Sequence, residues 1–113
     1  MKKIALSPGD PAGIGPEICL KSLYDNSENL CNFELIGDID FYKKLSKDLN
    51  LDLSFQNIFK REDFVTVKNI SLDSEVTFGM PNVSNSKYTL DVLMTGSLGC
   101  LNKEYSALVT GPD

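Results

Sequence analysis

The stretch KKIALSPGDPAGIGPE (residues 2–17) joins a short apolar run to a glycine-rich turn and then to the start of a helix. The apolar run stops at Pro8-Gly9, which predicts a buried strand that meets a turn. From Gly15 the spacing of apolar residues becomes helical, and Pro16 suits a first helical turn because proline has no N–H to lose there. This segment therefore predicts a strand, a turn of restricted conformation and a helix, in that order.

The same alternation continues along the rest of the chain. Further strands are predicted at residues 33–36, 51–55, 64–70 and 107–110, and further helices at residues 41–49 and 88–101. In the last helix the apolar side chains recur at helical spacing, at Leu90, Leu93, Met94 and Leu98. Residues 71–85 are weakly patterned and are expected to form an extended loop. Alternating strands and helices predict an α/β fold with a mostly parallel sheet and helices on both faces.

Length and charge limit the classes of protein that fit. The chain has 113 residues, enough for at most one domain. Its net charge of -5 has the wrong sign for a protein that binds nucleic acid through phosphate contacts. No apolar run approaches the roughly 18 to 20 residues of a membrane span, so we expect a soluble, cytoplasmic protein. The final strand is apolar and needs neighbours to cover it, which predicts that the chain is the front portion of a longer protein.

The residue types present also limit the chemistry. Histidine is absent, which removes the commonest general base and the commonest transition-metal ligand from this chain. The three cysteines form no C-x-x-C pair, so reduced thiols are expected rather than a zinc or redox site. We therefore assign no catalytic residue and no metal ligand within these residues.

The glycine-rich turn has two open interpretations. It is not a Walker A loop, because no Lys-Ser or Lys-Thr follows the glycines, and it lacks the third glycine of the Rossmann fingerprint. It could be a tightly packed connection between strand and helix, in which Asp10 serves as a turn residue. It could equally line a ligand, since a helix N-terminus behind glycines attracts anions, although Pro16 removes one N–H donor.

Two motifs together carry a family resemblance. The run GDPAGIGPE (residues 9–17) and the run CLNKEYSALVTGP (residues 100–112) resemble the start of the 4-hydroxythreonine-4-phosphate dehydrogenase family of pyridoxine biosynthesis. The related isocitrate and isopropylmalate dehydrogenases carry a shorter version of the first motif, whereas the second motif points to the pyridoxine branch. The resemblance covers the N-terminal third of such an enzyme.

The resemblance implies a fold, a reaction and cofactors. The fold is an incomplete isocitrate/isopropylmalate dehydrogenase-like one, with residues 1–113 as the N-terminal α/β portion of a longer, two-domain, homodimeric dehydrogenase. Such enzymes oxidise 4-(phosphooxy)-L-threonine with NAD or NADP, and the product then loses carbon dioxide. A divalent metal, zinc or alternatively magnesium or cobalt, is held by histidines expected downstream of this chain. The isolated chain is accordingly expected to be inactive.

The resemblance also nominates site residues. The members of the first loop that match the family are candidates for binding the cofactor: Asp10, Gly13, Ile14 and Gly15. Thr110 and Gly111, at the carboxyl end of the last strand, are candidates for binding the substrate. A different class of function stays open, namely a small stand-alone α/β module that binds an anion or a partner protein without catalysis.

Overall fold

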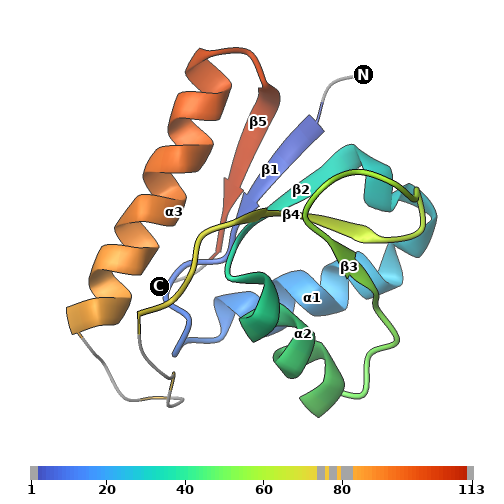
Figure 1. Cartoon of the computed structure of the whole chain (residues 1–113), viewed down its shortest axis with the longest axis horizontal. Helices are drawn as coiled ribbons and strands as arrows, with labels where there is room; N and C mark the ends of the chain where they lie inside the picture. Colours follow the sequence, from blue (N-terminus) through green and yellow to red (C-terminus); the bar gives the residue numbers. More distant parts are fainter. Residues whose placement is uncertain (1–2, 74–75, 77–78, 80–82, 112–113) are drawn as a thin grey trace.

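The chain folds as an open parallel sheet flanked by helices (Figure 1). The computed structural model describes residues 3–73, 76, 79 and 83–111. Within them the strands are β1 (Lys3–Ser7), β2 (Phe33–Gly37), β3 (Phe55–Gln56), β4 (Val65–Asn69) and β5 (Tyr105–Thr110). The helices are α1 (Gly15–Asp25), α2 (Ile39–Asp48) and α3 (Val83–Leu101), with a 3-10 helix, η1 (Ser27–Asn32), before β2.

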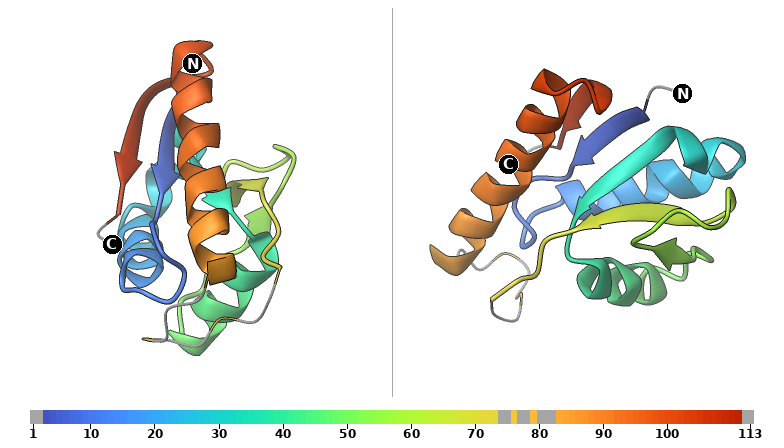
Figure 2. Two further views of the ribbon diagram at one scale, coloured as in Figure 1. Left: turned by 90° about the vertical axis from the view of Figure 1, so that its left-hand side faces the viewer. Right: turned by 45° about the horizontal axis from the view of Figure 1, so that its top comes forward.

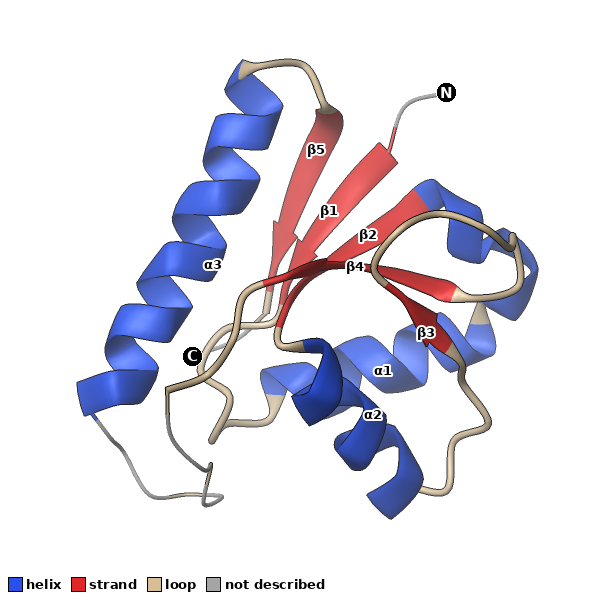
Figure 3. Ribbon diagram, in the orientation of Figure 1, coloured by secondary structure: helices blue, strands red, loops and turns tan. Residues whose placement is uncertain are grey.

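The strands lie in the order β3-β4-β2-β1-β5, and every pairing is parallel. Figure 2 shows α3 on one side of β1 and β5 and α1 on the other, and Figure 3 shows α1 and α2 together on the same face. Neighbouring residues of a strand point to opposite faces, so Leu6 joins the core beneath α1 and α2 while Ala5 joins the core beneath α3. The predicted α/β class, with helices on both faces, is confirmed.

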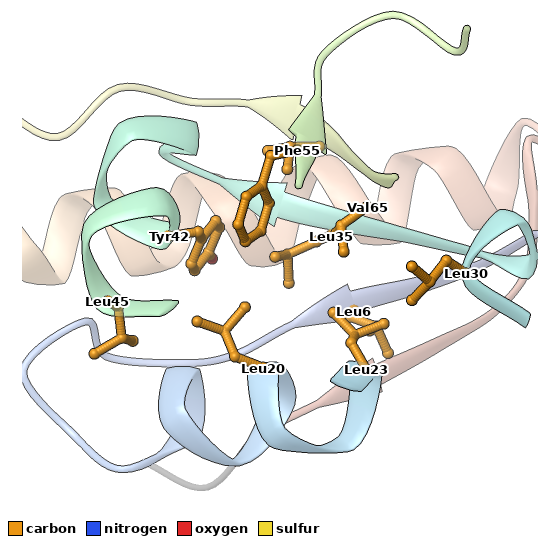
Figure 4. Packing of buried hydrophobic residues seen from close by; sticks show 10 residues of the cluster. Leu6, Leu20, Leu23, Leu30, Leu35, Tyr42, Leu45, Phe55 and Val65 are labelled. Carbon is orange, nitrogen blue, oxygen red and sulfur yellow. The ribbon is translucent and has the colours of Figure 1, made fainter. Parts of the chain in front are cut away.

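The larger core lies between the sheet and the helices α1 and α2 (Figure 4). Leu20 of α1 and Leu35 of β2 are both fully buried in it. Tyr42 of α2 is 2% exposed, and its hydroxyl donates a hydrogen bond of 2.8 Å to the carbonyl oxygen of Ile36. Truncating one of these leucines to alanine removes burial and leaves a cavity, at a typical cost of about 2–5 kcal/mol.

Several predicted elements have different bounds in the structure. Helix α2 begins at Ile39 rather than residue 41, because the Asp38 carboxylate accepts a hydrogen bond of 3.0 Å from the Phe41 N–H and caps the helix. Of the strand predicted at 51–55, only Phe55 belongs to β3, since Leu51 and Leu53 pack on the core without pairing. The 3-10 helix η1 was not predicted, and β5 begins two residues earlier than expected.

Helix α3 differs most from the prediction. It begins at Val83, five residues before the expected start, and its sheet-facing side is not the side that carries most of its leucines. Val92 is 1% exposed against the sheet, whereas Leu90, Met94 and Leu98 are 52–54% exposed. The sheet side carries Tyr88 and Val92, and it also includes a small residue at the point of closest approach: a Cβ on Gly96 would lie 2.6 Å from the Leu108 Cδ1 atom. The absence of a side chain at Gly96 therefore allows α3 to approach β5 closely.

Candidate functional site

The direction in which the chain adds successive strands to the sheet reverses between β1 and β5. From β1 the chain proceeds through β2 to the far side of the sheet, and after α3 it returns to place β5 on the other side of β1. In open α/β sheets, ligands bind outside the carboxyl ends of the strands at such a reversal. The candidate site is therefore the region where the β1–α1 loop meets the end of β5.

The two segments touch directly. The Gly111 N–H donates a hydrogen bond of 2.7 Å to the carbonyl oxygen of Ser7. A Cβ on residue 111 would overlap the carbonyl oxygen of Pro8, so only glycine allows this approach. Gly111 thus has a packing role at the end of β5, next to the loop that the sequence nominated for the cofactor.

The β1–α1 loop is held by its own hydrogen bonds. The Asp10 carboxylate accepts a hydrogen bond of 2.8 Å from the Ala12 N–H, and the Asp10 carbonyl accepts one of 2.9 Å from the Gly13 N–H. Gly9 has a φ of 89°, which favours glycine. Asp10 is therefore the turn residue that one interpretation of the sequence expected, and the same turn leaves Ile14 62% exposed at the start of α1.

A cavity of about 210 Å³ lies between α1 and the carboxyl end of β5. It brings Gly15 together with Thr110 and Gly111, whereas Asp10, Gly13 and Ile14 do not line it. Its other lining residues are mainly apolar and include no lysine or arginine: Leu6, Ile18, Cys19, Leu23, Phe33 and Val109 lie beside Ser22 and Asn26. Ligand pockets usually measure about 300–1,000 Å³. This cavity alone does not fit the charged phosphates of a dinucleotide.

The thiol in this cavity is not an activated nucleophile. Burial raises the pKa of Cys19 to about 11, because the thiolate would lose its hydration. At neutral pH the side chain is a neutral thiol, and a neutral thiol is a weak nucleophile. Cys19 therefore contributes packing to the cavity.

A second polar cluster at the carboxyl end of β2 was missed by the sequence analysis. The Asp38 N–H donates a hydrogen bond of 2.8 Å to the Tyr88 hydroxyl, and the Asp38 carboxylate accepts one of 2.8 Å from the Leu72 N–H. Burial is the main cause that raises the pKa of Tyr88 and of Tyr42, so both phenols stay neutral. The cluster joins α3 and residue 72 to the end of β2. The Gly-Asp pair after an apolar strand was the signal that could have indicated it.

Metal ligands do not gather in the part of the chain that the structure describes. Among residues 3–73, 76, 79 and 83–111 there is no group of three or more histidine, cysteine or carboxylate side chains placed to hold a metal ion. The residues present therefore do not fit a metal site of their own.

None of the helices within the same ranges has the length and apolar character needed to cross a membrane.

Fold and site together define an α/β protein with a stiff glycine-rich loop at the reversal of a parallel sheet. The chain is 36% identical over 121 residues to the 4-hydroxythreonine-4-phosphate dehydrogenase of Wigglesworthia glossinidia brevipalpis, a match that covers 99% of this chain and 35% of that enzyme. It is 28% identical over 116 residues to the enzyme of the same name from Pseudoalteromonas atlantica, with 97% of this chain and 35% of that enzyme covered. No family model matches.

Solved structures share the fold. The dehydrogenase of that name from Klebsiella pneumoniae superimposes with a TM-score of 0.86 at 20% identity, covering 99% of this chain and 37% of that one. The enzyme from Burkholderia phymatum gives 0.84 at 20% identity, with 99% and 36% covered. The expected resemblance to 4-hydroxythreonine-4-phosphate dehydrogenase, an oxidoreductase, is confirmed along nearly the whole chain. This chain spans about a third of the length of the curated relatives it matches.

Proposed function

We propose that residues 1–113 are the N-terminal α/β portion of a two-domain 4-hydroxythreonine-4-phosphate dehydrogenase. The observation that carries the proposal is the 36% identity to the Wigglesworthia enzyme across 99% of this chain. The complete enzyme would oxidise the hydroxyl group of 4-(phosphooxy)-L-threonine with NAD or NADP, and the product would lose carbon dioxide. We place this reaction in pyridoxal phosphate biosynthesis, in a cytoplasmic homodimer.

In this proposal the chain supplies the scaffold and one wall of the cleft in which cofactor and substrate bind. The loop with Asp10, Gly13, Ile14 and Gly15 lies beside the dinucleotide, and its internal hydrogen bonds hold it in one conformation without a ligand. A preformed loop loses less conformational entropy when the cofactor binds. Thr110 and Gly111 adjoin the same cleft from β5 and are proposed to face the substrate.

The metal of the complete enzyme is proposed to bind outside this chain. A divalent ion, zinc or alternatively magnesium or cobalt, supplies Lewis-acid polarisation of the reacting oxygen when bound. The described residues hold no ligand group for it, so no step of metal chemistry is assigned to them. Hydride transfer requires nicotinamide and substrate to be positioned together, so the 113-residue chain by itself is proposed to be inactive.

The test joins this chain to the remaining two thirds of the Wigglesworthia enzyme. NADH or NADPH formation from 4-(phosphooxy)-L-threonine is followed by absorbance, with the unmodified Wigglesworthia enzyme as positive control. We expect turnover from the joined polypeptide, loss of turnover after chelation, and none from the isolated chain. An active isolated chain would contradict the proposal, as would an inactive joined polypeptide beside an active positive control.

A variant of the joined polypeptide tests the cofactor loop. We expect Asp10→Ala to raise the KM for the dinucleotide, because the Ala12 N–H loses its partner and the loop loses its fixed shape. Asp25→Ala, at the exposed end of α1, is the matched control and should leave the KM unchanged. A lower free energy of unfolding with an unchanged KM would show that Asp10 is a turn residue only.

A further inference from the structure

Two buried polar side chains of α3 lack hydrogen-bond partners among the residues that the structure describes. Asn85 is 1% exposed, and neither the oxygen nor the nitrogen of its side-chain amide has a partner there. The hydroxyl of Thr89, one helical turn further along α3, is also buried without a partner in the same ranges. Side chains four residues apart on a helix are neighbours, about 5–6 Å apart at Cβ. These groups therefore form one polar cluster.

An unpaired amide at such depth is unfavourable. Burial removes the hydrogen bonds that water makes with the group, and nearly all buried polar groups in proteins recover them from protein or from ordered water. Exchanging the oxygen and nitrogen of the Asn85 amide does not help, because both atoms are unpaired. A polypeptide outside this chain cannot reach the amide directly, because the chain itself already encloses it. The partner must be small enough to lie within the fold.

The cluster lies at the level of the β1–α1 loop. The strands are parallel and α3 connects β4 to β5, so α3 runs opposite to them. A Cβ on Gly96 would contact Leu108, which pairs with Ala5 of β1. From Gly96 back to Asn85 the helix covers about 16 Å, the length of about five strand residues. The same distance beyond Ala5 leads to Asp10, and in Figures 1 and 2 the loop runs beside the first turns of α3.

The loop supplies acceptors more readily than donors. Pro8 and Pro11 are fully buried, and proline has a carbonyl acceptor but no N–H. A carbonyl can accept from the Asn85 nitrogen, but the Asn85 oxygen needs a donor. The Thr89 hydroxyl can use either kind of partner. A group that both donates and accepts satisfies the whole cluster, and water is the smallest such group.

We propose that Asn85 and Thr89 bind an ordered water molecule inside the fold, between the first turns of α3 and the β1–α1 loop. The water accepts a hydrogen bond from the Asn85 amide nitrogen, donates one to the amide oxygen and forms another with the Thr89 hydroxyl. Buried waters make about three such bonds, and three unpaired atoms are present. The water supports from behind the loop that carries the proposed cofactor residues. The site lies within this chain and does not depend on the proposed activity.

Nuclear magnetic resonance of the isotope-labelled chain tests the site. A water held within the fold gives cross-peaks of opposite sign in NOE and ROE spectra, whereas rapidly exchanging surface water does not. We expect peaks of opposite sign between water and the Asn85 side-chain amide. The amide of Asn102, which is exposed just after α3, is the internal control and should contact only rapidly exchanging water.

Thr89→Val separates the water from the hydroxyl. A hydroxyl proton that exchanges with solvent imitates a bound water, and valine removes this proton with little change of shape. The water keeps its two bonds to the Asn85 amide, so we expect the peaks at Asn85 to persist in the variant.

The sign of the stability change gives an independent readout. Replacing an unpaired buried hydroxyl by a methyl group would stabilise the fold, whereas replacing a hydroxyl that binds water removes a hydrogen bond. We expect Thr89→Val to lower the folding equilibrium constant about two- to tenfold in urea denaturation. Thr95→Val is the matched control, because the Thr95 hydroxyl donates a hydrogen bond of 2.8 Å to the Asp91 carbonyl at an exposed site on the same helix. Its effect should be smaller.

Three results would overturn the inference. One is an Asn85 amide with the same water contacts as Asn102, and another is the loss of the Asn85 peaks in Thr89→Val. The third is a Thr89→Val variant that is more stable than the unmodified chain. If the isolated chain does not fold, a high-resolution crystal structure of the joined polypeptide decides. Electron density for a water bonded to Asn85 and Thr89 would support the inference, and a protein atom or no density at that position would contradict it.

Discussion

Gly37→Ala is expected to be among the most destabilising single-methyl additions in this chain. Gly37 ends β2 with a φ of 144°, a conformation that side chains rarely adopt. Such strain costs about 1–3 kcal/mol. A Cβ there would also overlap the hydroxyl oxygens of both Tyr42 and Tyr88. Overpacking of this kind costs about another 1–3 kcal/mol.

The hydrogen bonds of those two hydroxyls add to the effect. The Tyr42 hydroxyl donates to the Ile36 carbonyl at 2.8 Å, and the Tyr88 hydroxyl accepts from the Asp38 N–H at 2.8 Å. Displacing either phenol leaves a backbone group without its partner, at about 1–3 kcal/mol each. Because these contributions share the same atoms they do not add fully, and we expect a loss of about 3–5 kcal/mol in the free energy of unfolding.

Urea denaturation followed by far-ultraviolet circular dichroism measures this loss. Gly79→Ala is the matched control: Gly79 also has a positive φ, of 74°, but a Cβ there meets nothing within 4 Å. It isolates the backbone strain, for which we expect about 1–2 kcal/mol. Equal losses for the two variants would refute the argument that the phenol cluster makes Gly37 necessary.

Three further predictions concern the cap, the buried thiol and the β5 contact. Asp38→Ala should lower the free energy of unfolding by at least about 1 kcal/mol, because the Phe41 N–H loses the carboxylate that caps the helix. Asp40→Ala, on the exposed first turn of the same helix, should lower it by less, and equal losses in urea denaturation would contradict the role of the cap. Cys19 is largely neutral in both states below about pH 8, and above it the thiol of the unfolded chain ionises first, so this thiol should lower stability by on the order of 2 kcal/mol from pH 9 to about 11. Cys19→Ala should make the fall of stability with pH shallower, although the raised pKa values of Tyr42 and Tyr88 still contribute to it, and an unchanged slope would exclude the thiol. Gly111→Ala should increase exchange of the residue-111 amide at least about tenfold by disrupting its hydrogen bond; unchanged protection would contradict the close approach seen here.

The candidate site was only partly predictable from the sequence. The loop with Asp10 was singled out because its glycines and prolines are local signals, and the structure places it at the strand reversal. That Gly15 would share a cavity with Thr110 and Gly111 could not be predicted, because these residues are about 95 positions apart in the sequence and meet only through the pairing of β1 with β5. The Tyr88 contact with Asp38 was missed for the same reason.

The order of strands and helices, and hence the α/β class, follows from the sequence alone. The spacing of apolar residues and the positions of turn residues are local features of the sequence, and they located β1, β2 and α1 closely. Which face of α3 would be buried depended on tertiary structure. The spacing of the leucines favoured burial of the side with Leu90 and Leu98. In the structure the side that carries Gly96 packs on Leu108 instead. Burial is decided by how closely two elements can approach, and that distance is set by side chains on both of them.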